Sequence, residues 1–168
     1  MILIFYNEIC DDVINHINEG FIVHDITADL EVQTISLFSQ LNEIVQLKKK
    51  LLHRYPNGVY MNPDMDSEQY IFIPTCILQD NIYNLVVKDK IWDDFDLSYI
   101  DITIKIMKLS LLHQLQDNPD LRIKLFMPII CTDISWQKIK QLLINNFLDM
   151  DIEVIVCYKE EQKKILER

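Results

Sequence analysis

Short runs of apolar residues recur along the chain, separated by polar segments, and each run has the length of a single β-strand. Runs with few polar interruptions are typical of strands that are buried on both faces of a sheet. We expect strands at residues 2–6, 21–26, 59–61, 70–73, 82–87, 123–130 and 152–158.

Helical spacing of apolar residues marks several of the segments between these strands. Residues 30–53 repeat apolar positions on one helical face, and a second helix is expected from about Leu97, with Asp96 as its N-cap. A last helix should begin near Ser135, and one or two helical turns fit residues 11–19. Strands that alternate with helices predict an α/β fold with helices on both faces of a mixed sheet.

Length and composition predict one domain without a metal or a cofactor. The 168 residues fit a domain at residues 1–158 with a charged tail at residues 159–168. The chain has no apolar stretch long enough for a membrane span, and its apolar N-terminus reads as a strand. No CxxC pair or histidine cluster occurs, so we expect reduced thiols in a cytoplasmic protein, and His24 on its apolar strand should be a core histidine.

Three short motifs lie within or next to these predicted elements. Residues 82–88 read Ile-Tyr-Asn-Leu-Val-Val-Lys, residues 21–24 read Phe-Ile-Val-His and precede Ala28-Asp29, and Met127-Pro128 precedes Trp136. Together they resemble the macro domain, in particular the branch that removes ADP-ribose esters from proteins. The resemblance implies a macro-domain-like three-layer α/β/α fold with a mixed central sheet.

The resemblance also implies positions for a catalytic pair and for an adenine-binding acid. Lys88 matches the lysine that acts as nucleophile in the ester-cleaving branch, and Asp133 lies near the position of its catalytic aspartate. The segment at residues 7–9, Asn-Glu-Ile, stands where the family carries Gly-Asp-Ile, whose aspartate holds adenine. The alternative, which we favour, is that Lys88 is an exposed lysine at a strand end and Asp133 a helix cap.

Both glycine-rich loops of the macro domain are missing from this sequence. Residues 31–36 and 130–135 occupy the two loop positions without any glycine, and the whole chain contains only Gly20 and Gly58. Glycine lets backbone N–H groups approach a diphosphate at positive φ without steric cost, and the β-branched residues of these loops resist that geometry. We therefore expect a degenerate macro domain that is not an enzyme, with the lysine–aspartate pair as a residual match only.

Acidic residues give the chain a formal net charge of −10 and gather in a few short segments. A solvated, solubilising surface is the simplest interpretation of any one cluster. Rows of carboxylates also mimic the phosphates of DNA, so they can enter the basic channel of a DNA-binding protein, whereas direct binding of nucleic acid is disfavoured. The residues expected to contact such a partner are Asp11, Asp12, Asp64, Asp66, Glu68, Asp89, Asp93, Asp94 and Asp96.

The sequence leaves two functional hypotheses. In the first, a non-enzymatic acidic protein blocks a host DNA-binding replication factor, and its length and acidity resemble those of staphylococcal-phage inhibitors of the bacterial DNA sliding clamp. That resemblance implies occupation of the basic channel of the clamp in the host cytoplasm, and a homodimer is left open. In the second, a divergent macro domain binds or hydrolyses ADP-ribose derivatives. The cleft between the two loops should be plugged by Ile35 or Ile134 in the first and open in the second.

Overall fold

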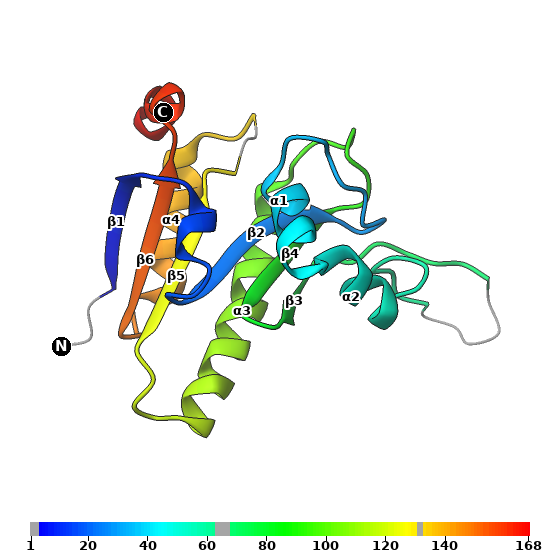
Figure 1. Ribbon diagram of the computed structural model, residues 1–168, viewed down its shortest axis with the longest axis horizontal. Helices are drawn as coiled ribbons and strands as arrows, with labels where there is room; N and C mark the ends of the chain where they lie inside the picture. Colours follow the sequence, from blue (N-terminus) through cyan, green and yellow to red (C-terminus); the bar gives the residue numbers. More distant parts are fainter. Residues whose placement is uncertain (1–3, 63–67, 131–132) are drawn as a thin grey trace.

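The computed structural model describes residues 4–62, 68–130 and 133–168, in which strands and helices alternate (Figure 1). None of the helices within these ranges has both the length and the apolar character needed to cross a membrane. The strands are β1 (Phe5–Cys10), β2 (Phe21–Thr27), β3 (Thr75–Gln79), β4 (Ile82–Lys88), β5 (Ile123–Pro128) and β6 (Ile152–Tyr158). The helices are α1 (Leu37–Val45), α2 (Leu47–Arg54), α3 (Leu97–Asp117) and α4 (Trp136–Phe147), with two 3-10 helices, η1 (Val13–His16) and η2 (Glu160–Glu167).

A six-stranded sheet lies at the centre of the fold, with the strand order β1-β6-β5-β2-β4-β3. Neighbouring strands are parallel except for β3, which runs antiparallel to β4 at one edge. Helices α3 and α4 cover one face of the sheet, and α1 and α2 cover the other (Figure 1). This arrangement confirms the predicted three-layer α/β/α fold with a mixed central sheet.

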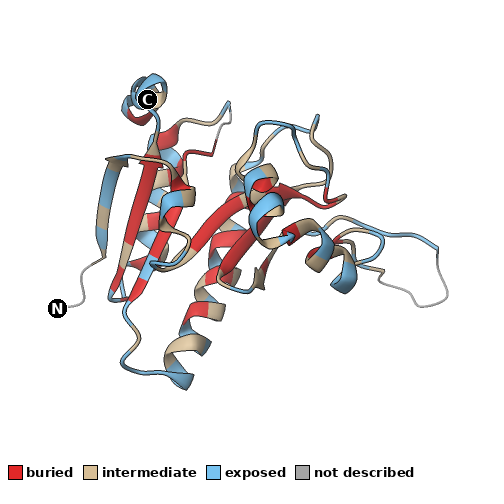
Figure 2. Cartoon of the chain, viewed as in Figure 1, coloured by how far each residue is buried: buried red, intermediate tan, exposed pale blue. Residues whose placement is uncertain are grey.

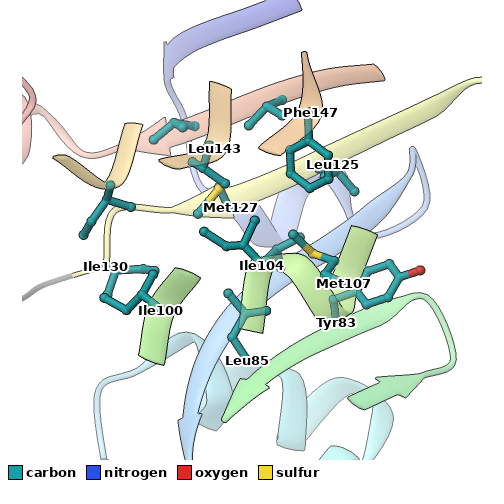
Figure 3. Close-up of a cluster of buried hydrophobic side chains, with 14 of the residues drawn as sticks. Tyr83, Leu85, Ile100, Ile104, Met107, Leu125, Met127, Ile130, Leu143 and Phe147 are labelled. Atoms are coloured by element: carbon teal, nitrogen blue, oxygen red, sulfur yellow. The ribbon is translucent and has the colours of Figure 1, made fainter. Parts of the chain in front are cut away.

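Buried residues are concentrated in the inner strands of the sheet (Figure 2), and the buried hydrophobic residues form two clusters, one on each face of the sheet. The larger cluster fills the space between the sheet and two helices, and contains Leu125 and Met127 of β5, Ile104 and Met107 of α3, and Leu143 of α4 (Figure 3). The smaller cluster packs α1 and α2 against the opposite face. Full burial of one aliphatic side chain contributes about 1.5–3 kcal/mol, so these clusters supply much of the driving force for folding.

Strands β2 and β5 separate soon after they begin. Their ladder contains only the pairs Phe21–Leu125 and Ile22–Phe126, whereas β2 pairs with β4 from Ile22 to Thr27. The sheet therefore divides into a β1-β6-β5 half and a β2-β4-β3 half. The larger core cluster crosses this division, since it contains residues of β4 as well as of β5 (Figure 3).

Two elements in the first third of the chain differ from their predicted bounds. Strand β1 spans Phe5–Cys10, so it continues four residues beyond the predicted end at residue 6, while residues 2 and 3 of the prediction lie outside the described residues. The helix expected from Leu30 begins only at Leu37, because residues 28–36 form a loop. It is then broken at Gln46, whose φ of 55° is left-handed, so that α2 is a separate helix. Ile44, near the end of α1, is 56% exposed.

The segment between α2 and β4 also differs from the prediction. The strands expected at residues 59–61 and 70–73 are reduced to one isolated bridge between Met61 and Ile71. The outer neighbour of β4 in the sheet is instead β3, a segment for which no strand is predicted. Residues of this edge strand are mostly half-buried, so its pattern lacks the continuous apolar run of the inner strands.

The C-terminal tail packs against α4. Leu166 of η2 is only 9% exposed, within a tail that is otherwise largely polar. The backbone N–H of Gln137 donates to the Arg168 carbonyl at 2.9 Å, and the Gln137 side chain donates to the Leu166 carbonyl at 2.5 Å. The tail is therefore helical, and packing holds it in place rather than leaving it frayed.

Candidate functional site

A cleft of about 470 Å³ opens at the carboxyl ends of β2 and β5. Its lining comes from the end of β2, the loop and first turns of α1 that follow it, the loop after β4, and Pro128 and Ile129 at the end of β5. Strands β4 and β3 continue the sheet on one side of this point, and β6 and β1 continue it on the other. Ligands of open α/β sheets bind where the strand order reverses in this way, which makes the cleft the candidate site.

Neither of the two isoleucines expected to plug the cleft fills it. Ile35 belongs to the lining but is 96% exposed. Ile134 is partly buried and packs against the larger core cluster. The cleft is therefore open, as the ADP-ribose hypothesis requires, and the plugged cleft expected for the inhibitor hypothesis is not found.

Side-chain hydrogen bonds fix the loop between β2 and α1 in place of glycine. Leu30 is fully buried with a left-handed φ of 58°, and its backbone N–H donates to the Thr27 carbonyl at 3.1 Å. The Asp29 carboxylate accepts from the Thr27 hydroxyl at 2.6 Å and from the Glu31 backbone N–H at 3.2 Å. From Glu31 to Ser36, all of which the structure describes, no residue has a positive φ. This stretch therefore lacks the alternating backbone geometry that forms an anion-binding nest.

Lys88 lies in the cleft, but its ammonium group is engaged by the loop after β4. The Nζ atom donates to the carbonyl oxygens of Ile91 at 2.9 Å and Asp93 at 3.1 Å, and lies 4.2 Å from the ring centroid of Phe95. Asp133 is exposed before α4 and does not belong to the cleft lining. The two members of the predicted pair are therefore not brought together in the cleft.

Asp25 of β2 is a cleft residue that the sequence analysis did not single out. It is partly buried and lines the cleft. Burial raises the pKa of this carboxyl group, although its own backbone N–H and the positive charge of Lys88 oppose the shift. A charged residue within the apolar run of β2 was the available signal in the sequence.

His24, the neighbour of Asp25, is a core histidine, as predicted. It is 2% exposed, and its Nε2 atom lies 2.6 Å from the Asn84 side-chain oxygen. Its ring packs edge-on against Phe38 at a centroid distance of 5.6 Å. Burial lowers the pKa of His24 to about 4, and the hydrogen bond to Asn84 only partly offsets this effect. The imidazole is therefore neutral at physiological pH and serves packing.

The acids after β1 lie beside the cleft and have local partners. Asp11 accepts hydrogen bonds from the Asn15 side chain and from His16, both at 2.8 Å, and Asp12 caps the first turn of η1. Both aspartates line the cleft. Glu8, expected at the adenine position, lies instead in the middle of β1, where it is exposed and outside the lining.

The acids after β4 shape the loop that carries them. Asp89 accepts a hydrogen bond from the Tyr60 hydroxyl at 2.6 Å, and Asp93 accepts one from the backbone N–H of Lys90 at 2.9 Å. Asp96 caps α3, as predicted, whereas Asp94 is exposed. Most of these carboxylates therefore have a structural role in addition to their charge.

Two groups of predicted contact residues lie at the same end of the sheet. One group follows β1 and the other follows β4, and the carboxyl ends of the parallel strands all lie along this one edge, which runs across the strands. That edge also carries the cleft. Asp64 and Asp66 lie outside the described residues, and Glu68 lies within them and is exposed.

Carboxylates outnumber cationic side chains in the cleft. Such a lining disfavours a diphosphate and favours neutral or cationic groups, because it concentrates negative potential in a concave site. The acidic lining residues are Asp11, Asp12, Asp25, Glu31 and Glu43, and the basic ones are Lys88 and Lys159.

The fold and the position of the cleft match those of macrodomains. No family model matches the sequence, and no curated protein matches it. The structure is similar to the macrodomain of Thermus aquaticus DarG, with a TM-score of 0.57 and 14% identity over 92% of this chain and 98% of that chain. The macrodomain of Mycobacterium tuberculosis DarG gives a TM-score of 0.57 and 15% identity over 95% and 99% of the two chains.

A viral domain shows the same likeness. The X-domain of IBV is similar with a TM-score of 0.56 and 10% identity, over 98% of this chain and 96% of that chain. At these identities the likeness establishes the fold alone. The chain therefore has a macro-domain-like α/β fold.

Proposed function

We propose that this protein is a macro-fold binding module whose cleft takes an ADP-ribose derivative without hydrolysing it. The observation that carries the proposal is the open cleft of about 470 Å³ at the point where β2 and β5 diverge. A cleft of this size is in the range of small-molecule sites, and its position follows the rule for ligand sites in open α/β sheets.

The contacts of Lys88 support binding rather than hydrolysis. A nucleophilic lysine must be neutral and must point at the substrate. Here Nζ donates to two carbonyl oxygens of the loop after β4 and lies over the Phe95 ring, so its hydrogen atoms are directed at that loop and not at a bound substrate. Asp133 is not among the residues that line the cleft.

Isothermal titration calorimetry with ADP-ribose tests the binding. We expect saturable heat for the wild type and for Leu148→Trp, a change at a site that is 56% exposed and outside the cleft. Thr34→Trp should abolish the heat, because Thr34 is an exposed lining residue and a large ring there occupies the cleft. Absence of wild-type binding at millimolar ADP-ribose contradicts the proposal.

A peptide that carries an ADP-ribosyl ester tests the absence of hydrolysis. We expect the ester to be recovered intact after incubation with the protein. Cleavage that is lost in Lys88→Met and retained in Lys163→Met, a change in the tail, would instead assign hydrolysis to the cleft lysine.

A second candidate function rests on the acidic residues that follow β1 and β4. Asp11 and Asp12 after β1, and Asp93 and Asp94 after β4, reach the same edge of the sheet. This placement supports docking of the edge into a basic DNA-binding channel, such as that of the sliding clamp, as a phage-encoded inhibitor acting in the host cytoplasm would do. Complementary charge speeds such an encounter and makes it sensitive to salt.

Retention of a purified bacterial sliding clamp on the immobilised protein tests this candidate. We expect retention at low salt that weakens steeply as salt rises. The double variant Asp93→Asn, Asp94→Asn should lose it, whereas Asp117→Asn with Asp120→Asn, at the opposite end of α3, should keep it. Equal retention by the two double variants, or none by the wild type, contradicts DNA mimicry.

A further inference from the structure

The imidazole ring of His24 on β2 is held in a single tautomer. Its Nε2 atom lies 2.6 Å from the side-chain oxygen of Asn84. The Asn84 amide nitrogen donates to the carbonyl oxygens of Ile77 at 3.1 Å and Ile82 at 3.2 Å, which fixes the orientation of the amide. Its oxygen can only accept, so Nε2 carries the proton. Burial lowers the pKa of His24 to about 4, so at physiological pH the ring is neutral and Nδ1 has a lone pair and no proton.

The Nδ1 atom of His24 is an unused hydrogen-bond acceptor in the cleft. Within the part of the chain that the structure describes, the ring contacts Asn84 and packs edge-on against Phe38, and it makes no other polar contact. His24 is only 2% exposed and lines the cleft. No side-chain nitrogen or oxygen of the described residues is both shielded from solvent and without a partner, so Nδ1 is reached from the cleft. A ligand that brings an N–H or O–H group to this atom satisfies a nearly buried acceptor.

The charge of the lining favours a positively charged donor. Three acidic lining residues, Asp12, Glu31 and Glu43, form no ion pair within the described ranges. Lys88, one of the two basic lining residues, directs its Nζ atom to the loop after β4. Negative potential that is concentrated in a concave site attracts a cation over a neutral group. Among the described residues no group of three His, Cys, Asp or Glu side chains is placed to hold a metal ion, which leaves an organic cation.

Apolar side chains on the same side of the sheet suit an aliphatic chain. The ring of Phe38 in α1 lies 5.6 Å from the His24 ring, between centroids. Val13 of η1 and Cys157 of β6 belong with Phe38 to the smaller core cluster, and all three line the cleft. The α1 side of the cleft therefore combines an apolar wall with one neutral acceptor and nearby carboxylates.

We propose that the α1 side of the cleft binds an organic cation with N–H donors, of the class of aliphatic amines. One N–H group donates to Nδ1 of His24, and the carboxylates of Asp12 and the other acidic lining residues match the charge. The inference goes beyond the ADP-ribose function proposed above and does not depend on it. It gives His24 a binding role in addition to its packing.

Titrations with three matched probes separate the two parts of this proposal. Putrescine carries both charge and N–H donors, its fully N-methylated analogue keeps the charge without the donors, and 1,4-butanediol keeps donors without the charge. We expect saturable binding of putrescine to the wild type. The methylated analogue should bind about tenfold more weakly or worse, the usual effect of losing a hydrogen bond to a charged group, and butanediol should not bind.

The variant His24→Gln isolates the role of Nδ1. Glutamine keeps a nitrogen that can donate to Asn84 but does not reproduce the acceptor at the position of Nδ1. The variant should bind putrescine about tenfold more weakly than the wild type does, while its affinity for the methylated analogue should change less than about twofold. His53→Gln, at an exposed histidine outside the cleft, should keep the wild-type affinities.

Nitrogen-15 NMR of the His24 ring tests the proposal without any variant. The free wild type should show a protonated Nε2 and an unprotonated Nδ1, and putrescine should shift the Nδ1 resonance more than the methylated analogue does. A protonated Nδ1 in the free protein, or an Nδ1 resonance that does not move at saturating putrescine, overturns the proposal.

The binding outcomes also separate this proposal from the function proposed above. Equal affinities of the wild type for putrescine and its methylated analogue overturn the role of His24, and equal affinities for putrescine and butanediol overturn the role of charge. A parallel titration with ADP-ribose completes the test. Binding of putrescine without binding of ADP-ribose supports the cation site and contradicts the ADP-ribose function, whereas the reverse result overturns the cation site alone.

Discussion

The buried imidazole of His24 predicts a defined loss of stability in acid. His24 is 2% exposed, and burial lowers its pKa to about 4 from an ordinary value of 6.5. The unfolded chain therefore binds a proton at His24 at a higher pH than the folded protein does. Stability from this residue is fully present above pH 6.5 and is lost as the pH falls towards the folded-state value.

The size of the loss follows from the two pKa values. Each pKa unit corresponds to about 1.4 kcal/mol of differential stability, so the drop from 6.5 to about 4 removes about 3 kcal/mol between pH 6.5 and pH 4. His16 does not contribute within this window. Partial burial alone would lower the pKa of His16, but hydrogen bonds to Glu19 and Asp11 outweigh burial and raise it. The stability that His16 contributes is therefore complete below pH 6.5 and declines only at higher pH.

Urea unfolding at a series of pH values measures this effect. His24→Gln removes the titrating group while keeping a nitrogen that can reach Asn84, so its unfolding free energy should fall about 3 kcal/mol less than that of the wild type between pH 6.5 and pH 4. His53→Gln, at an exposed histidine, should follow the wild type. The reasoning is refuted if His24→Gln and the wild type lose stability in parallel, or if the imidazole of His24 titrates near 6.5.

Three further substitutions test the local structure by thermal or urea unfolding. Asp96→Ala should lose about 1 kcal/mol because it removes the N-cap of α3, whereas Asp94→Ala, at an exposed position, should stay within about 0.5 kcal/mol of the wild type; equal losses would contradict the capping role. Met107→Ala should cost about 2–5 kcal/mol because the side chain is fully buried in the larger cluster, and Leu109→Ala, 66% exposed, serves as its control. Gln46→Gly should stabilise the protein by about 0.5–1 kcal/mol, since glycine adopts the left-handed φ of 55° without steric cost; destabilisation would show that the side chain matters.

The inner strands could be predicted because their signal is local. Strands β2, β4 and β6 are buried on both faces, and their nearly continuous apolar runs need no knowledge of the partner strand. Strand β3 is an edge strand with half-buried residues, so its identity depends on pairing with β4. The break at Gln46 was equally hidden, because neither glycine nor proline marks it.

The candidate site shows a similar division. Lys88 was found because it ends a recognisable strand motif, and the structure places it in the cleft. Asp25 was missed because one carboxylate in an apolar run belongs to no motif. Its significance depends on the divergence of β2 from β5, which is a property of the assembled sheet and not of any segment. The contacts of Lys88 could not be predicted from its place in the sequence motif, because all three are made with the loop that follows β4.

The two-pair ladder between β2 and β5, at Phe21 and Ile22, is the shortest ladder in the sheet. The two halves of the sheet are therefore held together mainly by the side chains of the larger cluster, which crosses the division. A ligand that contacts both β2 and β5 adds interactions between the two halves of the sheet. Occupancy of the cleft should therefore slow hydrogen exchange along β2 and raise the melting temperature, and the ligand would become part of what holds the two halves of the sheet together.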